Sequence, residues 1–303
     1  MRFLRWIGGG LALLVVIFLV IEVAFRVAGL FVGGEAASLD DGRTVVLCVG
    51  DSHTRGRPDP DNYPAALEQI LNERADRPYR VVNVGIPGLS TGQLRQRFVR
   101  FVEYYHPAVI LHWAGINNGW HHPEGQRGVV GWLTEHSKVA RFVRVAIFYR
   151  RLFRESEKGA PDLLAFDGGK SRARWNVNFG GKEEEVVTEH GAELPVEQVA
   201  LVTRDDLTFM MQTAKDRGIP MFLVKYGLAG GYYAPVNQAV IAISAQFGVP
   251  YIDSAAAAAE VHRVAPGERL YDDWVHPMPI VYRQTAEEAY KLLVDRGLVK
   301  PRS

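Results

Sequence analysis

The sequence contains a single cysteine, Cys48, among 303 residues. One cysteine excludes an intramolecular disulfide framework and any zinc or iron–sulfur site built on several cysteines. We expect Cys48 to be a small buried residue of a strand. An excess of charge is lacking as well, because 35 basic residues stand against 34 acidic ones and leave a formal net charge of +1. Such a chain has no basic surplus with which to hold nucleic acid.

Nucleotide-binding glycine patterns are also missing. Neither Gly-x-Gly-x-x-Gly nor the P-loop pattern occurs, so no nucleotide cofactor is expected. At 48% hydrophobic and 23% charged residues, the composition is that of an ordinary globular protein. It excludes a disordered or collagen-like chain.

One long hydrophobic run is present, at the N-terminus. Trp6–Ile21 carries no charge, and Arg2 and Arg5 precede it. About 20 apolar residues cross a bilayer core, so the pattern predicts a transmembrane signal anchor over residues 6–27. The arginines then place the N-terminus in the cytoplasm and the catalytic domain in the periplasm or outside the cell. The alternative is a cleaved signal peptide, for which Val27-Ala28-Gly29 is the only passable cleavage site.

After a cytoplasmic stub (1–5), the anchor and a tether (28–43), strand and helix patterns alternate. We expect strands at Thr44–Val49, Tyr79–Val84, Ala108–Trp113, Met221–Lys225 and Val249–Ile252. Helices are expected from Asn62 or Pro64 to Ala75, from Ser90 to about Tyr105, and at Pro195–Arg217, Pro235–Phe247 and Thr285–Arg296. The alternation predicts an α/β fold: one three-layer α/β/α domain over residues 44–299, with a mostly parallel, doubly wound sheet.

Residues from about 120 to 193 interrupt this alternation. They include a basic amphipathic segment, Val139–Arg154, followed by Gly- and charge-rich sequence without clear periodicity. We interpret the stretch as an insertion over the carboxyl edge of the sheet, where substrate-contacting loops lie. The amphipathic segment is expected to pack on the domain; lying on a membrane surface is the alternative.

Four predicted loops carry residues suited to acyl chemistry. Ser52 follows the first strand within Gly50-Asp51-Ser52, where a tight turn would expose its hydroxyl and point its own N–H at an oxyanion. Gly88 after the second strand and Asn117 after the third can supply further donors. Near the C-terminus, Asp273 precedes His276 by three residues and can orient its imidazole as a general base.

These four segments, in this order, resemble the SGNH (GDSL-type) hydrolase family. The resemblance covers about Val45 to the final helix and implies the flavodoxin-like SGNH hydrolase fold. It implies Ser52 as nucleophile, His276 as general base and Asp273 as the acid that orients it. The oxyanion hole would consist of the Ser52 and Gly88 amides and the Asn117 side chain. No metal or other cofactor is needed.

Three positions depart from the family pattern. His53 stands in place of the usual leucine, Asn118 in place of an aspartate, and Val281 in place of a glycine. The second departure puts substrate contacts in question, and the third puts the local turn in question.

Several neighbouring residues invite other roles. We expect Asp51 to hold loop amides and Asp272 to point away from His276. His53 is expected to be an exposed loop residue; contact with the substrate is the alternative. His121 and His122 beside Glu124 are expected to form solvated loop rather than a metal site. Trp113 and Trp120 flank the asparagine loop, where stacking on a sugar and core packing explain them equally well.

Together these residues predict a membrane-anchored serine esterase. It would hydrolyse O-acyl or O-acetyl esters through an acyl-enzyme. The substrate would be a cell-envelope or extracellular carbohydrate or lipid, with no nucleic-acid partner. The alternatives are a sugar O-acyltransferase that uses the same triad, and a non-catalytic glycan-binding or assembly protein that keeps the fold.

Overall fold

The computed structural model describes residues 41–121, 172–179, 182–189, 194–272 and 275–302. These residues belong to one compact unit made of 38–122 and 167–303. The predicted amphipathic segment Val139–Arg154 lies outside the described residues, as do His122 and Glu124.

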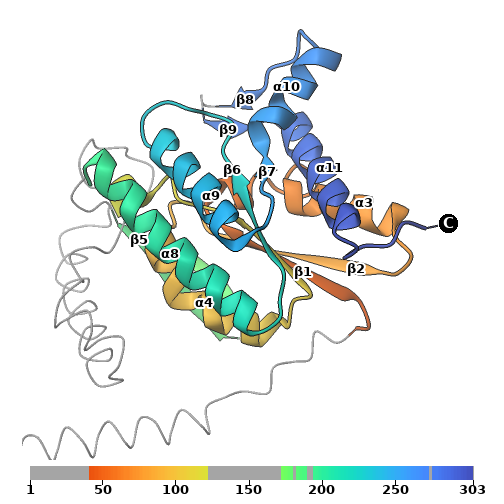
Figure 1. Ribbon diagram of the computed structural model, residues 1–303, viewed down its shortest axis with the longest axis horizontal. Helices are drawn as coiled ribbons and strands as arrows, with labels where there is room; N and C mark the ends of the chain where they lie inside the picture. Colours follow the sequence, from red (N-terminus) through yellow and green to blue (C-terminus); the bar gives the residue numbers. More distant parts are fainter. Residues whose placement is uncertain (1–40, 122–171, 180–181, 190–193, 273–274, 303) are drawn as a thin grey trace, which may run out of the picture. The chain divides into compact units, whose positions relative to one another are not determined.

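A parallel five-stranded sheet forms the centre of this unit (Figure 1). Its order is β2 (Tyr79–Gly85), β1 (Thr44–Gly50), β3 (Val109–Trp113), β6 (Met221–Lys225) and β7 (Ile252–Asp253). The order in sequence, 2-1-3-4-5, is that of flavodoxin-like folds, and its direction of winding reverses between β1 and β3. The predicted doubly wound parallel sheet is confirmed.

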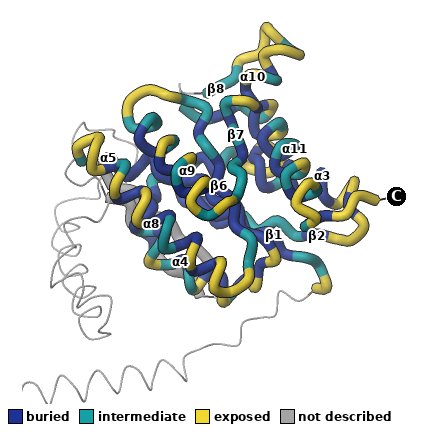
Figure 2. The backbone as a smooth tube through the Cα atoms, viewed as in Figure 1, coloured by how far each residue is buried: buried dark blue, intermediate teal, exposed yellow. Residues whose placement is uncertain are grey.

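Helices cover both faces of the sheet. On one face lie α3 (Tyr63–Arg74) and α11 (Pro279–Asp295), and on the other lie α4 (Thr91–Tyr105), α8 (Val196–Asp216) and α9 (Tyr233–Phe247). Strand residues alternate between the two cores: Cys48 packs with α3 and α11, and its neighbours Leu47 and Val49 pack with the other helices. The inner strands β1, β3 and β6 are buried over nearly their whole length, whereas most of the edge strand β2 is half-buried. Exposed residues lie on the outer faces of the helices and in loops (Figure 2). The predicted three layers are thus confirmed.

Helix starts follow the capping residues of the sequence. The side chain of Asn62 accepts a hydrogen bond from the backbone amide of Ala65 and begins α3. Ser90 and Gln93 form a capping box at the start of α4. The closing helix α11 contains the predicted residues from Thr285 onward and begins earlier, at Pro279, because proline is well suited to the first helical turn.

Some elements were not expected. Within the predicted insertion, β4 (Arg172–Phe179) and β5 (Lys182–Glu189) form an antiparallel pair. Nearer the C-terminus lie α10 (Ser254–Val264) and a short antiparallel pair, β8 (Tyr271–Asp272) with β9 (His276–Pro277). Two one-turn helices, α2 (Ser52–Arg55) and α5 (Asn118–His121), follow β1 and β3.

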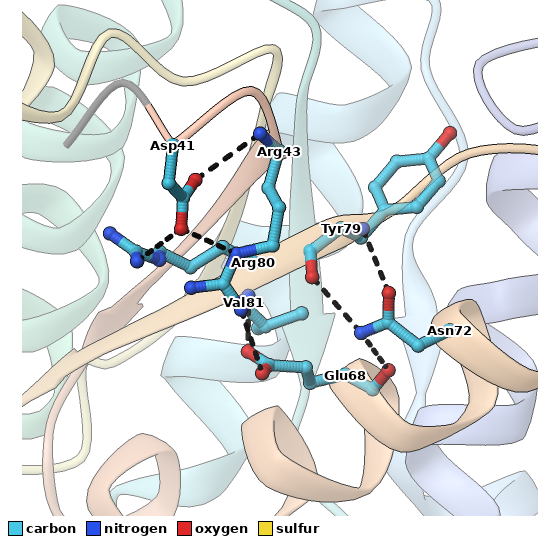
Figure 3. Close-up of polar contacts among 7 residues, drawn as sticks. All are labelled: Asp41, Arg43, Glu68, Asn72, Tyr79, Arg80 and Val81. Atoms are coloured by element: carbon cyan, nitrogen blue, oxygen red, sulfur yellow. Dashed lines mark hydrogen bonds and ion pairs between the residues drawn. The ribbon is translucent and has the colours of Figure 1, made fainter.

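Side chains of α3 form hydrogen bonds with backbone groups on the outer edge of β2 (Figure 3). Asn72 accepts a hydrogen bond from the Tyr79 amide (2.9 Å) and donates one to the Tyr79 carbonyl (3.0 Å), as a neighbouring strand would. Glu68 accepts a hydrogen bond from the Val81 amide at 2.7 Å. An edge strand otherwise presents unpaired backbone groups on which other chains can pair. Here helix side chains occupy part of that edge.

The transmembrane part of the fold prediction is corrected. Residues 6–27 are outside the described residues, and within the described ranges no helix is both long and apolar enough to cross a membrane. Crossing takes about 20 consecutive apolar residues, whereas the longest of these helices, α8 with 21 residues, is interrupted by charges such as Arg204 and Asp205. The single-pass localisation, with a cytoplasmic N-terminus and a catalytic domain outside, is therefore not supported.

Candidate active site

The predicted nucleophile Ser52 lies at the switch point of the sheet. It begins α2 directly after β1, between the loops that follow β2 and β3. Asp51 caps this helix, since its carboxylate accepts a hydrogen bond from the His53 amide at 2.9 Å. The Asp51 amide in turn donates to the Trp113 carbonyl at the end of β3 (3.1 Å). Ligands of open α/β sheets bind at such a switch point, outside the carboxyl ends of the strands.

Ser52 and His276 are brought into contact although 224 positions separate them. The Ser52 Oγ and the His276 Nε2 lie 2.9 Å apart, within hydrogen-bond distance. Both residues are half-buried. His276 lies on β9, which pairs with β8, and so its backbone is part of a short ladder next to α11.

The neighbouring acids have different surroundings. The Asp272 carboxylate forms an ion pair with Arg57, and its Oδ1 lies 3.5 Å from Nη2 of Arg269. Asp272 is thus engaged with arginines, while its backbone lies directly opposite that of His276 in the β8–β9 pair. That its side chain points away from His276 stays a prediction. Asp273 lies outside the described residues.

The predicted oxyanion donors lie on the two adjoining loops. The Leu89 amide donates to the Ile86 carbonyl at 3.1 Å, and Gly88 has a φ of 76°. With Pro87 at the second position, this is a type II turn, whose third residue requires positive φ. Asn117 is 7% exposed, and its Nδ2 donates to the Leu89 carbonyl at 3.3 Å. This bond joins the asparagine loop to the glycine turn.

The loops meet closely because the second strand ends in glycine. A Cβ on Gly85 would lie 2.2 Å from the Arg55 amide nitrogen. Only glycine therefore allows α2 to approach the end of β2 this closely.

Asp51 is fully buried and connects three elements of the site. Besides capping α2, its carboxylate accepts a hydrogen bond from the Tyr226 hydroxyl at 2.6 Å, and Nδ2 of Asn117 lies 3.5 Å from the same oxygen. The expected structural role of Asp51 is confirmed. Burial, together with the Asp51 carboxylate, raises the pKa of Tyr226 well above its usual value, so the hydroxyl keeps its proton and donates it.

Tyr226 was not anticipated from the sequence. It directly follows β6, at the edge of the sheet where the other site residues gather, and its hydroxyl also accepts a hydrogen bond from the Ile116 amide (3.3 Å). The sequence feature that could have indicated Tyr226 is a polar aromatic residue directly after a predicted buried strand.

The expectation that His53 is an exposed loop residue is wrong. His53 is 3% exposed, and its Nε2 lies 3.2 Å from the Val275 carbonyl oxygen. Because α2 begins at Ser52 and turns inward, its second residue faces the core and the segment that carries His276.

Asn118 takes part in a buried network. Its side chain accepts from the Thr91 amide (2.8 Å) and donates to the hydroxyls of Thr91 (2.8 Å) and Thr203 (2.7 Å). It therefore connects α4 to α8 and fixes the end of the loop that carries Asn117. Val281, in place of the family's glycine, is buried in the first turns of α11 against Ala258 and Val261 of α10.

The remaining candidates are part of the core or lack a described side chain. Cys48 is buried, and its burial raises the pKa of the thiol to about 12. Trp113 is buried as well, as core packing requires. The side chains of Trp120 and His121 are not among those described, and the described residues contain no group of His, Cys, Asp and Glu that could hold a metal ion.

A hydroxyl and an imidazole paired at the switch point of a flavodoxin-like sheet are the elements of a serine-hydrolase site. The chain belongs to the GDSL-like lipase/acylhydrolase family, whose model matches residues 48–284. It is accordingly an enzyme that acts on ester bonds, and the family resemblance seen in the sequence is confirmed. No curated protein matches the chain.

Solved structures of this family are similar to the chain at low identity. A lipase/acylhydrolase from Enterococcus faecalis is 14% identical, with a TM-score of 0.50 over 86% of this chain and 99% of its own. The similarity in this case is one of fold. A putative G-D-S-L lipolytic protein from Desulfitobacterium hafniense DCB-2 is 15% identical (TM-score 0.48; 83% and 100% covered). An acetylxylan esterase from Geobacillus stearothermophilus, Axe2, is 17% identical (TM-score 0.49; 82% and 94% covered).

Proposed function

We propose that this chain is a serine esterase that cleaves carboxylic O-acyl esters through an acyl-enzyme. The observation that carries the proposal is the 2.9 Å contact between the Ser52 Oγ and the His276 Nε2. In this arrangement Nε2 accepts the hydroxyl proton as the oxygen attacks the ester carbonyl. The same imidazole then donates the proton to the departing alcohol.

The second half of the reaction reverses these steps with water. Water loses a proton to His276, attacks the acyl carbon on Ser52, and releases the carboxylic acid. Ser52 recovers its proton from His276. Both halves pass through a tetrahedral intermediate with a negative oxygen.

We assign the stabilisation of that oxygen to the Ser52 and Gly88 amides and to Asn117. The type II turn gives Gly88 a fixed backbone, and the bond from Asn117 to the Leu89 carbonyl fixes the asparagine beside it. The Asn117 amide group has two hydrogens. One keeps the bond to Leu89, and the other, which faces Asp51 at an Nδ2 to oxygen distance of 3.5 Å, would leave that long contact to donate to the oxyanion. Preorganised donors of this kind contribute about 3 kcal/mol each to the stabilisation of a transition state.

We assign the orientation of His276 to Asp273. Its neighbour Asp272 already pairs with Arg57 and Arg269, which leaves Asp273 as the nearest acid in sequence for this role. An acid three residues before the histidine can fold back to bind Nδ1 and keep Nε2 able to accept a proton.

For the substrate, we propose an O-acyl ester in which the alcohol part is a carbohydrate or a lipid. The family description names lipases, which act on lipid esters, and acylhydrolases, a term that leaves the alcohol open. The proposed chemistry needs only the acyl carbon, the alcohol oxygen and water.

Hydrolysis of p-nitrophenyl acetate tests the proposal. Ser52→Ala is expected to lower kcat by at least about 10³-fold, because removing a member of a triad removes the activated hydroxyl. Asp273→Asn is expected to lower kcat far more than the matched variant Asp272→Asn does. Activity equal to wild type in Ser52→Ala would disprove the assignment, and a larger loss in Asp272→Asn would move the orienting role to Asp272.

A further inference from the structure

We propose that His53 is a positioning residue that holds His276 in place against Ser52. This inference rests on the proposed function, because it concerns the same pair of residues. His53 is adjacent to Ser52 in the chain, and Val275 is adjacent to His276. One hydrogen bond between His53 and Val275 thus connects the chain neighbour of Ser52 with the chain neighbour of His276.

The bond runs from a side chain to a backbone carbonyl. The His53 Nε2 lies 3.2 Å from the Val275 oxygen. A carbonyl oxygen can only accept, so Nε2 carries the hydrogen and donates it. The backbone of His53 is fixed at the other end by the 2.9 Å bond from its amide to Asp51.

The His53 ring is fixed on several sides. Its centroid lies 4.7 Å from that of Tyr226, which it meets edge-on, and 5.5 Å from that of Trp113. It also lies 5.1 Å from the His276 ring, tilted by 39°. With 3% of its surface exposed, His53 has little room to change rotamer. It therefore restricts the position of His276 both through the backbone of Val275 and by direct ring packing.

A leucine, the residue usual at this position in the family that the sequence resembles, would fill the space without donating a hydrogen bond. The Val275 carbonyl would then lose the donor that fixes the peptide next to His276. Rates of catalysed reactions are sensitive to such shifts, since a misplacement of about 1 Å can cost about 10²-fold. The residue at position 53 is thus expected to affect the chemical step more than substrate binding.

Three substitutions separate the hydrogen bond from the packing. Glutamine places its amide nitrogen as many bonds from Cα as the histidine Nε2, and it can keep the bond to Val275. Asparagine is similar in chemistry but reaches only as far as Nδ1, and leucine fills space alone. His262→Leu, at an exposed histidine of α10, is the matched control.

The measurement is kcat and KM for p-nitrophenyl acetate, with unfolding in urea for every variant to establish that it is folded. We expect His53→Leu and His53→Asn to lower kcat by about 10- to 100-fold while KM changes by less than about twofold. His53→Gln should recover most of the lost kcat. A residue that only supports the fold would lower stability without this pattern of rescue.

Two outcomes would overturn the inference: wild-type kcat in the folded leucine variant, or equal losses in the glutamine and asparagine variants. Failure of the proposed function is distinguishable from both. In that case wild type and Ser52→Ala would hydrolyse the ester equally, and the positioning role of His53 would be disproved together with the proposed function.

Discussion

At the scale of single residues, the site contains a buried carboxylate with several donors around it. Asp51 has no exposed surface, yet one of its oxygens accepts from the His53 amide and the other from the Tyr226 hydroxyl. Burying an ionised carboxylate is unfavourable unless hydrogen bonds replace the water it loses. Here those bonds also fix the turn before Ser52 and the loop that carries Asn117.

His112 is buried without such compensation. It lies on β3, and neither of its ring nitrogens has a hydrogen-bond partner within the described part of the chain. Burial lowers the pKa of His112 from 6.5 to about 4, because the protonated imidazole would lose its hydration. In the folded protein the ring therefore stays neutral down to that pH.

This makes stability depend on pH. Between about pH 4 and pH 6.5 the unfolded chain binds a proton at His112 that the folded protein does not, so the free energy of unfolding falls as the pH falls through that window. The loss between about pH 7.5 and about pH 5 is on the order of 2 kcal/mol. Urea unfolding at both pH values should show that His112→Leu removes this difference, whereas the exposed His262→Leu keeps it. An unchanged pH dependence in His112→Leu would contradict this account.

At the scale of elements, strand ends and helix starts determine where the functional groups lie. β1 leads directly into α2, β2 into the Gly88 turn, and β3 into the Asn117 loop. These parallel strands have neighbouring carboxyl ends, because β1 pairs with both β2 and β3. Three loops that are distant in sequence therefore meet at one edge of the sheet.

The edge of β2 gives a prediction of its own. Asn72→Ala removes the donor and the acceptor that pair with the Tyr79 backbone, and we expect it to lower the free energy of unfolding by about 1–3 kcal/mol. Glu73→Ala, at the next, exposed position of α3, should lower the free energy of unfolding much less. Urea unfolding measures both. A cost for Asn72→Ala no larger than for Glu73→Ala would mean that the edge bonds contribute nothing, and kcat should change in neither variant.

Most of the elements, and the pairing of Ser52 with His276, could be predicted from the sequence. Buried strands and amphipathic helices have strong periodicity, and Ser52 and His276 lie in recognisable motifs. The pair β4–β5 was missed because it lies among Gly- and charge-rich sequence, although Arg172–Phe179 alternates polar and apolar residues and Gly180-Gly181 separates the two strands. The burial of His53 could not be predicted, since it depends on where a segment more than 200 residues away packs.

At the scale of the whole molecule, two cores on opposite faces of one sheet hold the site together. α3 and α11 pack on one face, and α4, α8 and α9 pack on the other. α11 follows β9 directly, so the packing of this last helix also fixes the strand that carries His276. The contact between Ser52 and His276 thus depends on the complete sheet with both helix layers.

Covalent labelling by a fluorophosphonate shows whether Ser52 is an activated nucleophile, because the reagent reacts with a serine only where a neighbouring base activates it. Mass spectrometry of the digested protein should find a single adduct, on the peptide that contains Ser52. Labelling should be lost in Ser52→Ala and strongly slowed in His276→Ala, while the control His262→Leu reacts as wild type does. No labelling of the folded wild-type protein, or an adduct on another serine, would mean that Ser52 is not the activated nucleophile.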